Sequence, residues 1–454
     1  MIDRLEVVNF RAFRTESFNF SRLNIFVGRN NSGKSSALSA LNILAQTTNN
    51  TQLDSGPLIL NGEFDQLGTF KDMVHGGRAN TPVRISFSIR DVQCQFEVKY
   101  RTQRREMEIS KYRLSRNGNS VFEYAATKDR YDVHINGVNI DELGDHIKKK
   151  RPKFDGFLPV FSDIMIALRR ARDADRTFHE SKYNFFRDVD RNLFHFRRLM
   201  IESFGSFESL GPFRDIPKRT YLYSGETAAN VGRTGENAVT MIASDNSKRG
   251  SERVGFVDEI TKWMRATEIS GGVRVKNLTD RHFEVVVIGN DGTEHNICDV
   301  GFGCSQVLPV LVAGIGHALL RRSRTAPILI IQEPEIHLHP NAQAALGSFF
   351  ANLVSYRGQV FIETHSDNLV LRVARHVALG DLSPDQVKIF YVEDAAGGRK
   401  VHEVGIDKTG SFNPDWPGGF FPQRQHESFE VARAAIRENK NRTGEQLEFR
   451  YPSK

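Results

Sequence analysis

Residues 28–35 read Gly28-Arg29-Asn30-Asn31-Ser32-Gly33-Lys34-Ser35, which is the pattern G-x-x-x-x-G-K-S. The apolar run Leu23–Val27 before it predicts a strand, and apolar residues at helical spacing predict a helix over about 33–46. Between a strand and a helix, the glycines let backbone N–H groups wrap phosphates at the helix N-terminus. Lys34 would then reach the β and γ phosphates of ATP, and the Ser35 hydroxyl would bind Mg²⁺. An ordinary glycine turn is the alternative, and the strand-loop-helix context weighs against it.

A second polar sequence follows the apolar run Ile328–Ile331, which predicts a buried strand. The strand ends in Gln332-Glu333-Pro334-Glu335. In P-loop enzymes an acid at such a strand end binds Mg²⁺ or activates the attacking water. Glu333 is therefore the predicted general base, and Glu335 is either structural or a subunit contact. The alternative is a buried strand with a solvated acidic end.

A third apolar run, Val360–Ile362, continues into Glu363-Thr364-His365-Ser366. This pattern puts a single histidine at the tip of a predicted strand. His365 there can hydrogen-bond a γ phosphate and sense its loss. A loop histidine with an ordinary partner remains the alternative.

The fourth motif, residues 299–306, reads Asp299-Val300-Gly301-Phe302-Gly303-Cys304-Ser305-Gln306 and precedes a predicted apolar helix over 307–320. Small residues at a helix N-terminus can form an anion site. The glycines could instead only shape the turn from strand to helix.

The pattern along the whole chain predicts an α/β fold. Alternating polar and apolar residues over 97–140 predict antiparallel strands, residues 157–207 predict a helical insertion, and residues 221–253 predict a loop. Later apolar runs predict buried strands of a doubly wound sheet at 283–288, 328–331, 360–363 and 387–392. The predicted units are an N-terminal head part (1–145), an inserted helical and basic lobe (146–210), a C-terminal head part (211–400) and a tail (401–454).

Composition adds only broad limits. The 454 residues carry a formal net charge of +7, which suits an acidic partner but decides little. The cysteines Cys94, Cys298 and Cys304 form no C-x-x-C pair, so neither a disulfide framework nor a zinc ribbon is predicted. The N-terminus lacks a basic start with an apolar run, and on inspection of the sequence no apolar stretch approaches the ~18 residues of a membrane span. A cytoplasmic protein with no membrane partner is expected.

Together the four motifs, in this order, resemble those of ABC-type ATPase heads of the SMC, RecF and OLD-like group. The closest likeness is to stand-alone OLD-like bacterial ATPases of phage-defence systems. Leu5–Phe13 looks like the first strand of the group, residues 25–35 like its Walker A motif, and residues 303–306 like its signature motif. Residues 332–335 with His337-Leu338-His339-Pro340 look like Walker B and the D-loop, and His365 takes the place of the switch histidine.

The resemblance implies an α/β P-loop NTPase of ABC-ATPase type, with an antiparallel strand-rich N-terminal lobe and an inserted helical lobe. It also implies a homodimer or higher even-numbered oligomer, in which Gly303 and Ser305 of one subunit contact the γ phosphate held by Lys34 of the other. The implied cofactors are ATP and Mg²⁺. Catalysis is assigned to Glu333 and His365, metal binding to Ser35 and Gln332, and nucleotide binding to Arg11, Gly28, Asn30, Asn31, Ser32, Gly33, Lys34, Ser35, Ser36, Gly303, Ser305 and Gln306.

The sequence departs from this group at one position, because Gln332 stands where Walker B has an aspartate. A neutral amide can still order a metal-bound water but brings no charge, so weaker metal binding and slow hydrolysis are expected. The Q-loop glutamine is not fixed, and Gln46 and Gln66 are both candidates. The H-x-H spacing of His337 and His339 could suggest zinc, but the D-loop explains both histidines.

Three functions remain open. The first is an ATP-driven switch that acts on an effector, a nuclease or toxin from a neighbouring gene, in antiviral defence; no acidic cluster of a fused nuclease follows His365. The stretches Leu210–Asp215 and Asp415–Phe421 also look like those of a bacterial branch encoded beside partner genes. The second is a RecF-like DNA-binding ATPase, with nucleic acid held by residues 148–153, Arg169, Arg170, Arg172, Arg197 and Arg198. The third is an ATP-bound scaffold with little hydrolysis. A GTPase is disfavoured because no N-K-x-D motif occurs, and a transporter subunit because the insertions are large.

Overall fold

The structure is a computed structural model that describes residues 1–50, 56–126, 131–139, 152–160, 180–226, 228–319, 327–356, 358–395, 398–414, 430–431 and 433–434. Several sequence predictions lie outside these residues. They are the basic run at 148–151, Arg169, Arg170, Arg172 and the stretch Asp415–Phe421.

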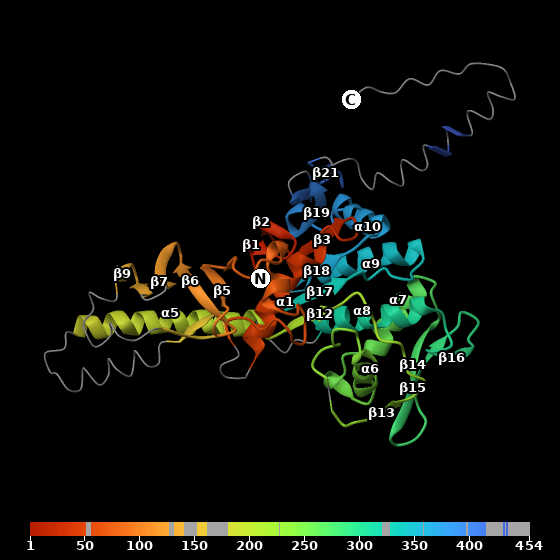
Figure 1. The fold of residues 1–454 in the computed structure, drawn as a ribbon. Helices are drawn as coiled ribbons and strands as arrows, with labels where there is room; N and C mark the ends of the chain where they lie inside the picture. Colours follow the sequence, from red (N-terminus) through yellow and green to blue (C-terminus); the bar gives the residue numbers. More distant parts are fainter. Residues whose placement is uncertain are drawn as a thin grey trace, which may run out of the picture.

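A seven-stranded sheet forms the centre of the molecule (Figure 1). Its first five strands in spatial order are parallel, and the last two are antiparallel additions. The P-loop strand β3 therefore lies between β18 and β19, and β17 lies one strand further away. In order the strands are β12 (Phe207–Leu210), β17 (Ile328–Gln332), β18 (Gln359–Glu363), β3 (Leu23–Gly28), β19 (Val387–Ala395), β20 (Gly398–Ile406) and β21 (Phe412–Asn413).

An eight-stranded antiparallel sheet carries the N-terminal part of the chain. This sheet confirms the α/β class with a strand-rich N-terminal lobe. Its order is β2 (Phe13–Asn19), β1 (Arg4–Phe10), β4 (Val83–Ile89), β5 (Val92–Arg101), β6 (Glu106–Arg116), β7 (Asn119–Ala126), β8 (Tyr131–Ile135) and β9 (Val138–Asn139).

Two smaller groups of strands complete the sheets. One is the hairpin β10 (Lys153–Asp155) and β11 (Leu158–Val160). The other contains β13 (Tyr221–Leu222), β15 (His282–Ile288), β14 (Gly272–Asn277) and β16 (Glu294–Asn296). The helices are α1 (Lys34–Asn49), α2 (Phe70–Met73), α5 (Glu180–Phe204), α6 (Ala238–Asn246), α7 (Phe256–Ala266), α8 (Phe302–Leu319), α9 (Pro340–Leu353) and α10 (Asp367–Ala378), with short 3₁₀ turns η1 (His75–Gly77), η3 (Gly250–Glu252) and η4 (Pro384–Gln386).

Side-chain alternation along the central strands divides the interior into two cores. In β18, Phe361 joins the core shared with α1 and the antiparallel sheet, whereas Val360 and Ile362 join the core shared with helices α6–α10. In β17, Ile328 and Ile330 belong to the core on the α1 side, and Leu329 and Ile331 belong to the core on the other side. Because successive side chains of a strand point to opposite faces, Gln332 and Glu363 also lie on the α1 side.

Two sequence predictions about the fold were wrong in part. The apolar segment at 283–288 forms β15 of the small antiparallel sheet, not a strand of the parallel sheet, because buried strands of both kinds have the same composition. Helix α6 lies within the predicted loop 221–253; it has only 9 residues, too few for a clear period. The predicted insertion contains the helix α5 but also the hairpin β10–β11, and the predicted boundary at residue 400 falls inside β20.

Helix α8 also corrects an expectation. Its 18 residues have a mean hydropathy of 1.5, so by length and composition alone it could cross a membrane. However, 67% of this segment is buried inside the fold, where it packs against β12, β17 and the helices α6, α7 and α9. A core position accounts for its apolar character.

Candidate functional site

The loop between β3 and α1 makes a tight turn that depends on two glycines. Gly28 has φ 148° and Gly33 has φ 108°, a region that side chains rarely allow. A Cβ atom at Gly28 would lie 2.2 Å from the carbonyl oxygen of Val392, and one at Gly33 would lie 2.5 Å from the Cβ of Ala12. The loop is therefore packed between β19 and the β1–β2 turn, in the predicted strand-loop-helix arrangement.

Lys34 is the buried cation of this loop. Its side chain is 3% exposed, and Nζ donates hydrogen bonds to the carbonyls of Gly28 (3.1 Å) and Arg29 (3.0 Å). Burial lowers the pKa of Lys34, and the nearby carboxylates of Glu363, Glu333 and Glu335 oppose that shift. The ammonium group is thus held inside the loop, where a phosphate could replace the carbonyls.

The start of α1 fits an anion. Gly33 is the N-cap and offers no side-chain cap, and the first turn contains no acidic residue. The Ser32 hydroxyl is buried and has no hydrogen-bond partner in the described part of the chain. Free N–H groups at a helix start, a positive dipole end and an unused hydroxyl are the donors that a phosphate group needs.

Gln332 and Glu363 lie side by side at the ends of β17 and β18. The two residues are register partners, and Glu363 is in turn the partner of Phe26 in β3. Glu363 Oε2 accepts a hydrogen bond from Gln332 Nε2 (2.7 Å), and Oε1 accepts one from the Ser35 hydroxyl (2.8 Å). Burial raises the pKa of Glu363, while these hydrogen bonds and the charge of Lys34 lower it. Oxygen donors of this kind fit Mg²⁺.

Glu333 and His365 face each other across the adjoining strand ends. Glu333 has φ 47°, its N–H donates to the carbonyl of Glu363 (2.7 Å), and its Oε1 lies 3.9 Å from Nε2 of His365. Burial and the charge of Lys34 lower the pKa of His365, and Glu333 opposes the shift. A partly exposed carboxylate beside a histidine can hold and deprotonate a water molecule.

Glu335 is buried behind this pair. Its Oε1 accepts a hydrogen bond from the backbone N–H of His365 (2.6 Å), so it joins the loop after β17 to the loop after β18. Burial raises the pKa of Glu335, while hydrogen bonding to His365 lowers it. Within this chain Glu335 has the structural role that was one of its two predicted roles.

Arg214 is a basic residue that the sequence reasoning did not assign to the site. Its guanidinium donates to the carbonyls of Gln332 (2.7 Å) and Pro212 (2.7 Å). Burial lowers the pKa of Arg214 to about 10, and the charges of Glu335 and Glu333 oppose that effect. Arg214 therefore fixes the backbone at the end of β17 and places a positive charge near Glu333 and Glu335.

The signature residues 303–306 lie in the first turns of α8. Gly303 packs on the D-loop, because a Cβ there would lie 3.0 Å from the carbonyl oxygen of His337, and Phe302 is 61% exposed. Ser305 is buried and its hydroxyl donates to the Phe302 carbonyl (3.1 Å), while Gln306 is half-buried. No recorded hydrogen bond or ion pair joins residues 303–306 to Lys34 within the described residues.

The remaining predicted residues lie around the loop. Arg11 Nη1 donates to the Ser39 hydroxyl (3.1 Å), which places its guanidinium along the first turns of α1, and Ser36 is buried in the same helix. Asn30 and Asn31 are exposed at the tip of the loop. Arg399 of β20 donates to the Asn31 carbonyl (2.8 Å), a contact that the sequence reasoning missed.

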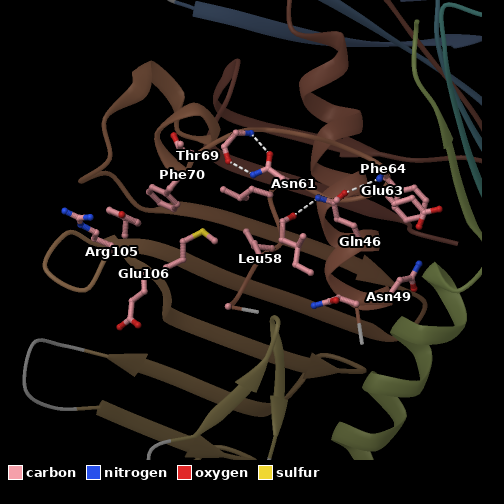
Figure 2. Close-up of a pocket in the computed structure, with 18 residues that line it drawn as sticks. Gln46, Asn49, Leu58, Asn61, Glu63, Phe64, Thr69, Phe70, Arg105 and Glu106 are labelled. Carbon is pink, nitrogen blue, oxygen red and sulfur yellow. Dashed lines mark hydrogen bonds between the residues drawn. The ribbon is translucent and has the colours of Figure 1, made fainter. Parts of the chain in front are cut away.

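Gln46, one candidate for the Q-loop, has a structural role instead. Its Nε2 donates to the Ile59 carbonyl (2.7 Å) and its Oε1 accepts from the N–H groups of Phe64 and Asp65. Figure 2 shows Gln46 beside a cavity of about 940 Å³. That cavity lies toward the far end of α1, roughly 18 Å from Lys34 at 1.5 Å per helical residue. The other candidate, Gln66, is exposed on the segment that follows.

The two D-loop histidines lie on the surface before α9. In the portion of the chain that the structure describes, no three His, Cys, Asp or Glu side chains come close enough to hold a metal. His337 is exposed, and His339 is the N-cap residue of α9.

The residues that sequence reasoning missed share one feature. Glu363 and Arg214 lie within stretches that had been noted and Arg399 does not, yet the contacts of all three join segments that are separate in sequence. For Glu363 a signal was present, since it ends an apolar run as Gln332 does. For Arg214 and Arg399 no local pattern identifies the partner.

Family models match most of the chain. A model described as an AAA ATPase domain matches residues 1–370, and a model described as a protein of unknown function (DUF3696) matches residues 382–430. Among curated proteins, none matches this chain.

Solved structures of Smc head domains are similar over most of their length. The Smc head bound to the C-winged helix domain of ScpA has 13% identity and a TM-score of 0.41, covering 90% of this chain and 98% of that one. The Smc head with an extended coiled coil bound to the C-terminal domain of ScpA from Pyrococcus furiosus has 13% identity and a TM-score of 0.40, with 90% and 97% covered. The SMC head domain from Thermotoga maritima has 10% identity and a TM-score of 0.37, with 88% and 98% covered.

Proposed function

Because this chain belongs to the family of AAA ATPase domains, we propose that it binds ATP in the loop around Lys34 and hydrolyses it. The observation that carries the proposal is the meeting of three distant stretches at one edge of the central sheet. There Ser35, Gln332 and Glu363 are joined by hydrogen bonds of 2.7–2.8 Å, with Lys34 and Glu333 beside them. A phosphate-binding loop next to a metal-binding set of oxygens and a free carboxylate is what phosphoryl transfer to water requires.

The residues of this chain have separate tasks in that reaction. The backbone N–H groups of residues 32–35 and the Lys34 ammonium bind the β and γ phosphates, and Ser35 with Gln332 faces the metal. Mg²⁺, when bound, neutralises charge on the phosphates. Glu333 orients a water molecule and accepts its proton, while His365 donates a hydrogen bond toward the γ phosphate. Arg214 and Glu335 keep these two loops in place.

The complete site is proposed to form between two chains. The signature residues 303–306 lie on α8 and share no hydrogen bond or ion pair with Lys34 among the described residues, and Phe302 beside them is 61% exposed. A second copy in head-to-tail orientation would bring its Gly303 and Ser305 to the phosphates held by Lys34. ATP would then favour the dimer, or a higher even-numbered oligomer, and hydrolysis would release it.

The ATP-driven change is proposed to act on an effector protein, a nuclease or toxin, in antiviral defence in the cytoplasm, as stand-alone OLD-like ATPases do. Support for this step is the sequence resemblance alone. The DNA-binding alternative has less support, because two of its basic residues already have acidic partners: Arg197 pairs with Asp155, and Arg198 pairs with Glu202 at 2.6 Å. A slowly hydrolysing scaffold is the second candidate, favoured by the neutral Gln332.

Phosphate release with ATP and Mg²⁺ tests the proposal in the wild type, Lys34→Ala and Glu333→Gln. Loss of the Lys34 ammonium is expected to weaken ATP binding and lower turnover by about 100-fold or more. Glu333→Gln is expected to lower turnover by roughly 100-fold or more, with ATP still bound, because only the general base is removed. Lys71→Ala, which removes an exposed lysine of α2, is the matched control and should change neither ATP binding nor turnover.

Two outcomes would contradict the proposal. A wild-type protein that binds no ATP would rule out the nucleotide site altogether. If the wild-type protein binds ATP through Lys34 but releases no phosphate, alone or with its neighbouring gene product, the scaffold function would be favoured over the enzyme.

A further inference from the structure

We propose that Glu363 supplies the acidic Mg²⁺ ligand that this chain lacks at Gln332. The proposal rests on ATP binding at Lys34, as described above. It adds a metal ligand on the strand next to Walker B, at the residue that precedes the switch-histidine loop. The acid and the amide would thus have exchanged strands.

The strand order allows an acid on β18 to reach the site of a metal bound by Ser35. Gln332 in β17, Glu363 in β18 and Phe26 in β3 form one register row across three adjacent strands. Neighbouring strands lie about 4.8 Å apart, so Glu363 is one strand from the phosphate-binding loop and Gln332 is two. Alternation directs both side chains toward α1, where Ser35 lies in the first turn of the helix. A carboxylate on β18 therefore reaches the Ser35 hydroxyl without help from β17.

The contacts of Glu363 also fit this role. Oε1 accepts from the Ser35 hydroxyl (2.8 Å), and that hydroxyl is the predicted first metal ligand of the loop. Oε2 accepts from Gln332 Nε2 (2.7 Å), which fixes the orientation of the carboxylate. A ligand oriented by a neighbouring hydrogen-bond donor is the arrangement found behind metal-binding carboxylates.

A simple ion pair with Lys34 does not explain this carboxylate. The Lys34 ammonium lies 4.0 Å from Glu363 Oε1, at the limit of an ion pair, and donates instead to two backbone carbonyls. Glu363 is only 4% exposed, so its charge is costly to bury. When a triphosphate occupies the loop, a carboxylate at this position would repel it. A divalent cation between the two removes that repulsion.

The metal dependence of ATP binding tests the inference. The affinity of the full-length protein for a fluorescent ATP analogue is measured with Mg²⁺ and with EDTA, and bound Mn²⁺ is counted by electron paramagnetic resonance. In the wild type, Mg²⁺ should tighten binding. In Glu363→Gln, which keeps the shape of the side chain, this Mg²⁺-dependent gain should fall about tenfold or more, and nucleotide-dependent Mn²⁺ binding should be lost, while binding in EDTA remains.

The double variant Gln332→Glu with Glu363→Gln is the matched rescue, because it returns the acid to the Walker B strand and keeps one acid and one amide. It should recover most of the Mg²⁺-dependent gain and the bound Mn²⁺. Glu333→Gln is the control for lowering the negative charge of the site. It should keep the Mg²⁺-dependent gain in affinity and the bound Mn²⁺ while losing turnover.

The outcomes separate this inference from the proposed function. Full Mg²⁺ dependence and full Mn²⁺ binding in Glu363→Gln would overturn the role of Glu363 and leave the ATPase proposal intact. Absence of ATP binding in the wild type would overturn both. If Glu363→Gln does not fold, the double variant decides, since metal-dependent binding in it supports the exchange and its absence overturns it.

Discussion

The two large sheets of this protein differ in where their polar and charged side chains lie. In the parallel sheet the strands β17 and β18 are apolar along their length, and polar side chains such as Gln332, Glu333 and Glu363 gather where the strands end. In the antiparallel sheet, charged residues are spread along one face and pair across strands, as in Lys99 with Glu108 at 3.0 Å.

This difference follows from the burial of the sheets. A parallel sheet covered on both faces can expose polar groups only at its edges, and the carboxyl ends of all its strands lie at the same edge. An antiparallel sheet with one wet face places polar groups at every second residue. We therefore expect large effects from substitutions at the carboxyl edge of the parallel sheet and small effects on the face of the antiparallel one.

The largest effect is expected from Gly28→Ala. Its Cβ would lie 2.2 Å from the Val392 carbonyl oxygen at φ 148°, so β3 and β19 would have to separate. We expect a loss of about 3 kcal/mol in the free energy of unfolding, together with loss of ATP binding. Gly118→Ala, in the β6–β7 turn, is the matched control, because φ is 79° but nothing lies within 4 Å. Chemical denaturation compares the two; equal losses would contradict the role of crowding in the loop.

Arg214→Lys should have the next largest effect. An ammonium group cannot donate to the Pro212 and Gln332 carbonyls with the same planar geometry, so the end of β17 loosens. The expected loss is about 2 kcal/mol of stability, with a fall in phosphate release that exceeds any fall in ATP affinity.

Arg219→Lys is the control for Arg214→Lys, since this exposed arginine pairs with Asp299 at the surface. It should leave stability nearly unchanged, because solvent screens an exposed ion pair. Unaltered phosphate release in Arg214→Lys would show that the backbone at Glu333 needs no such support.

His317, at the amino edge of the parallel sheet, should make stability depend on pH. Burial lowers its pKa from 6.5 to about 4, and its Nε2 has no hydrogen-bond partner among the described residues. Between pH 6.5 and 4 the unfolded chain binds a proton that the folded chain does not. Stability should therefore fall as the pH is lowered through this range, by about 2 kcal/mol between pH 7.5 and 5.

Denaturation of the His317→Gln variant at both pH values isolates this contribution, because glutamine does not titrate. The stability of the wild type relative to the variant should fall by about 2 kcal/mol between pH 7.5 and pH 5. His282→Gln, which replaces an exposed histidine, is the matched control and is measured at the same two pH values.

The smallest effect is expected on the antiparallel sheet, from Glu108→Gln. Burial raises the pKa of Glu108, but hydrogen bonds and charge from Arg101 and Lys99 outweigh it and the pKa is lowered. Because both basic partners are about a third exposed, solvent screens the ion pairs, and the loss of stability should stay below about 1 kcal/mol. Phosphate release should not change. A loss as large as that of Arg214→Lys would break the contrast between the two sheets.

Sequence patterns predicted the parts of the site that are local. Apolar periodicity indicated the correct positions for local elements, because each is set by neighbours within a few residues. These elements are the loop 28–35, the strands at 328–331 and 360–363, and the helix that begins at Lys34. The antiparallel strands over 97–140 were predicted for the same reason, as far as the structure describes them. The segment 283–288 was assigned to the wrong sheet, since its composition does not record its pairing partner.

The sequence by itself predicted a phosphate-binding loop at residues 28–35 and showed an amide, not an acid, at Gln332, because both are read from adjacent residues. Only the tertiary structure decided that Glu363 lies between Gln332 and Ser35, that Arg214 fixes the end of β17, and that Gln46 binds backbone groups far from the loop. These contacts join residues up to 328 positions apart, and they follow from strand order and register, which short-range periodicity does not encode.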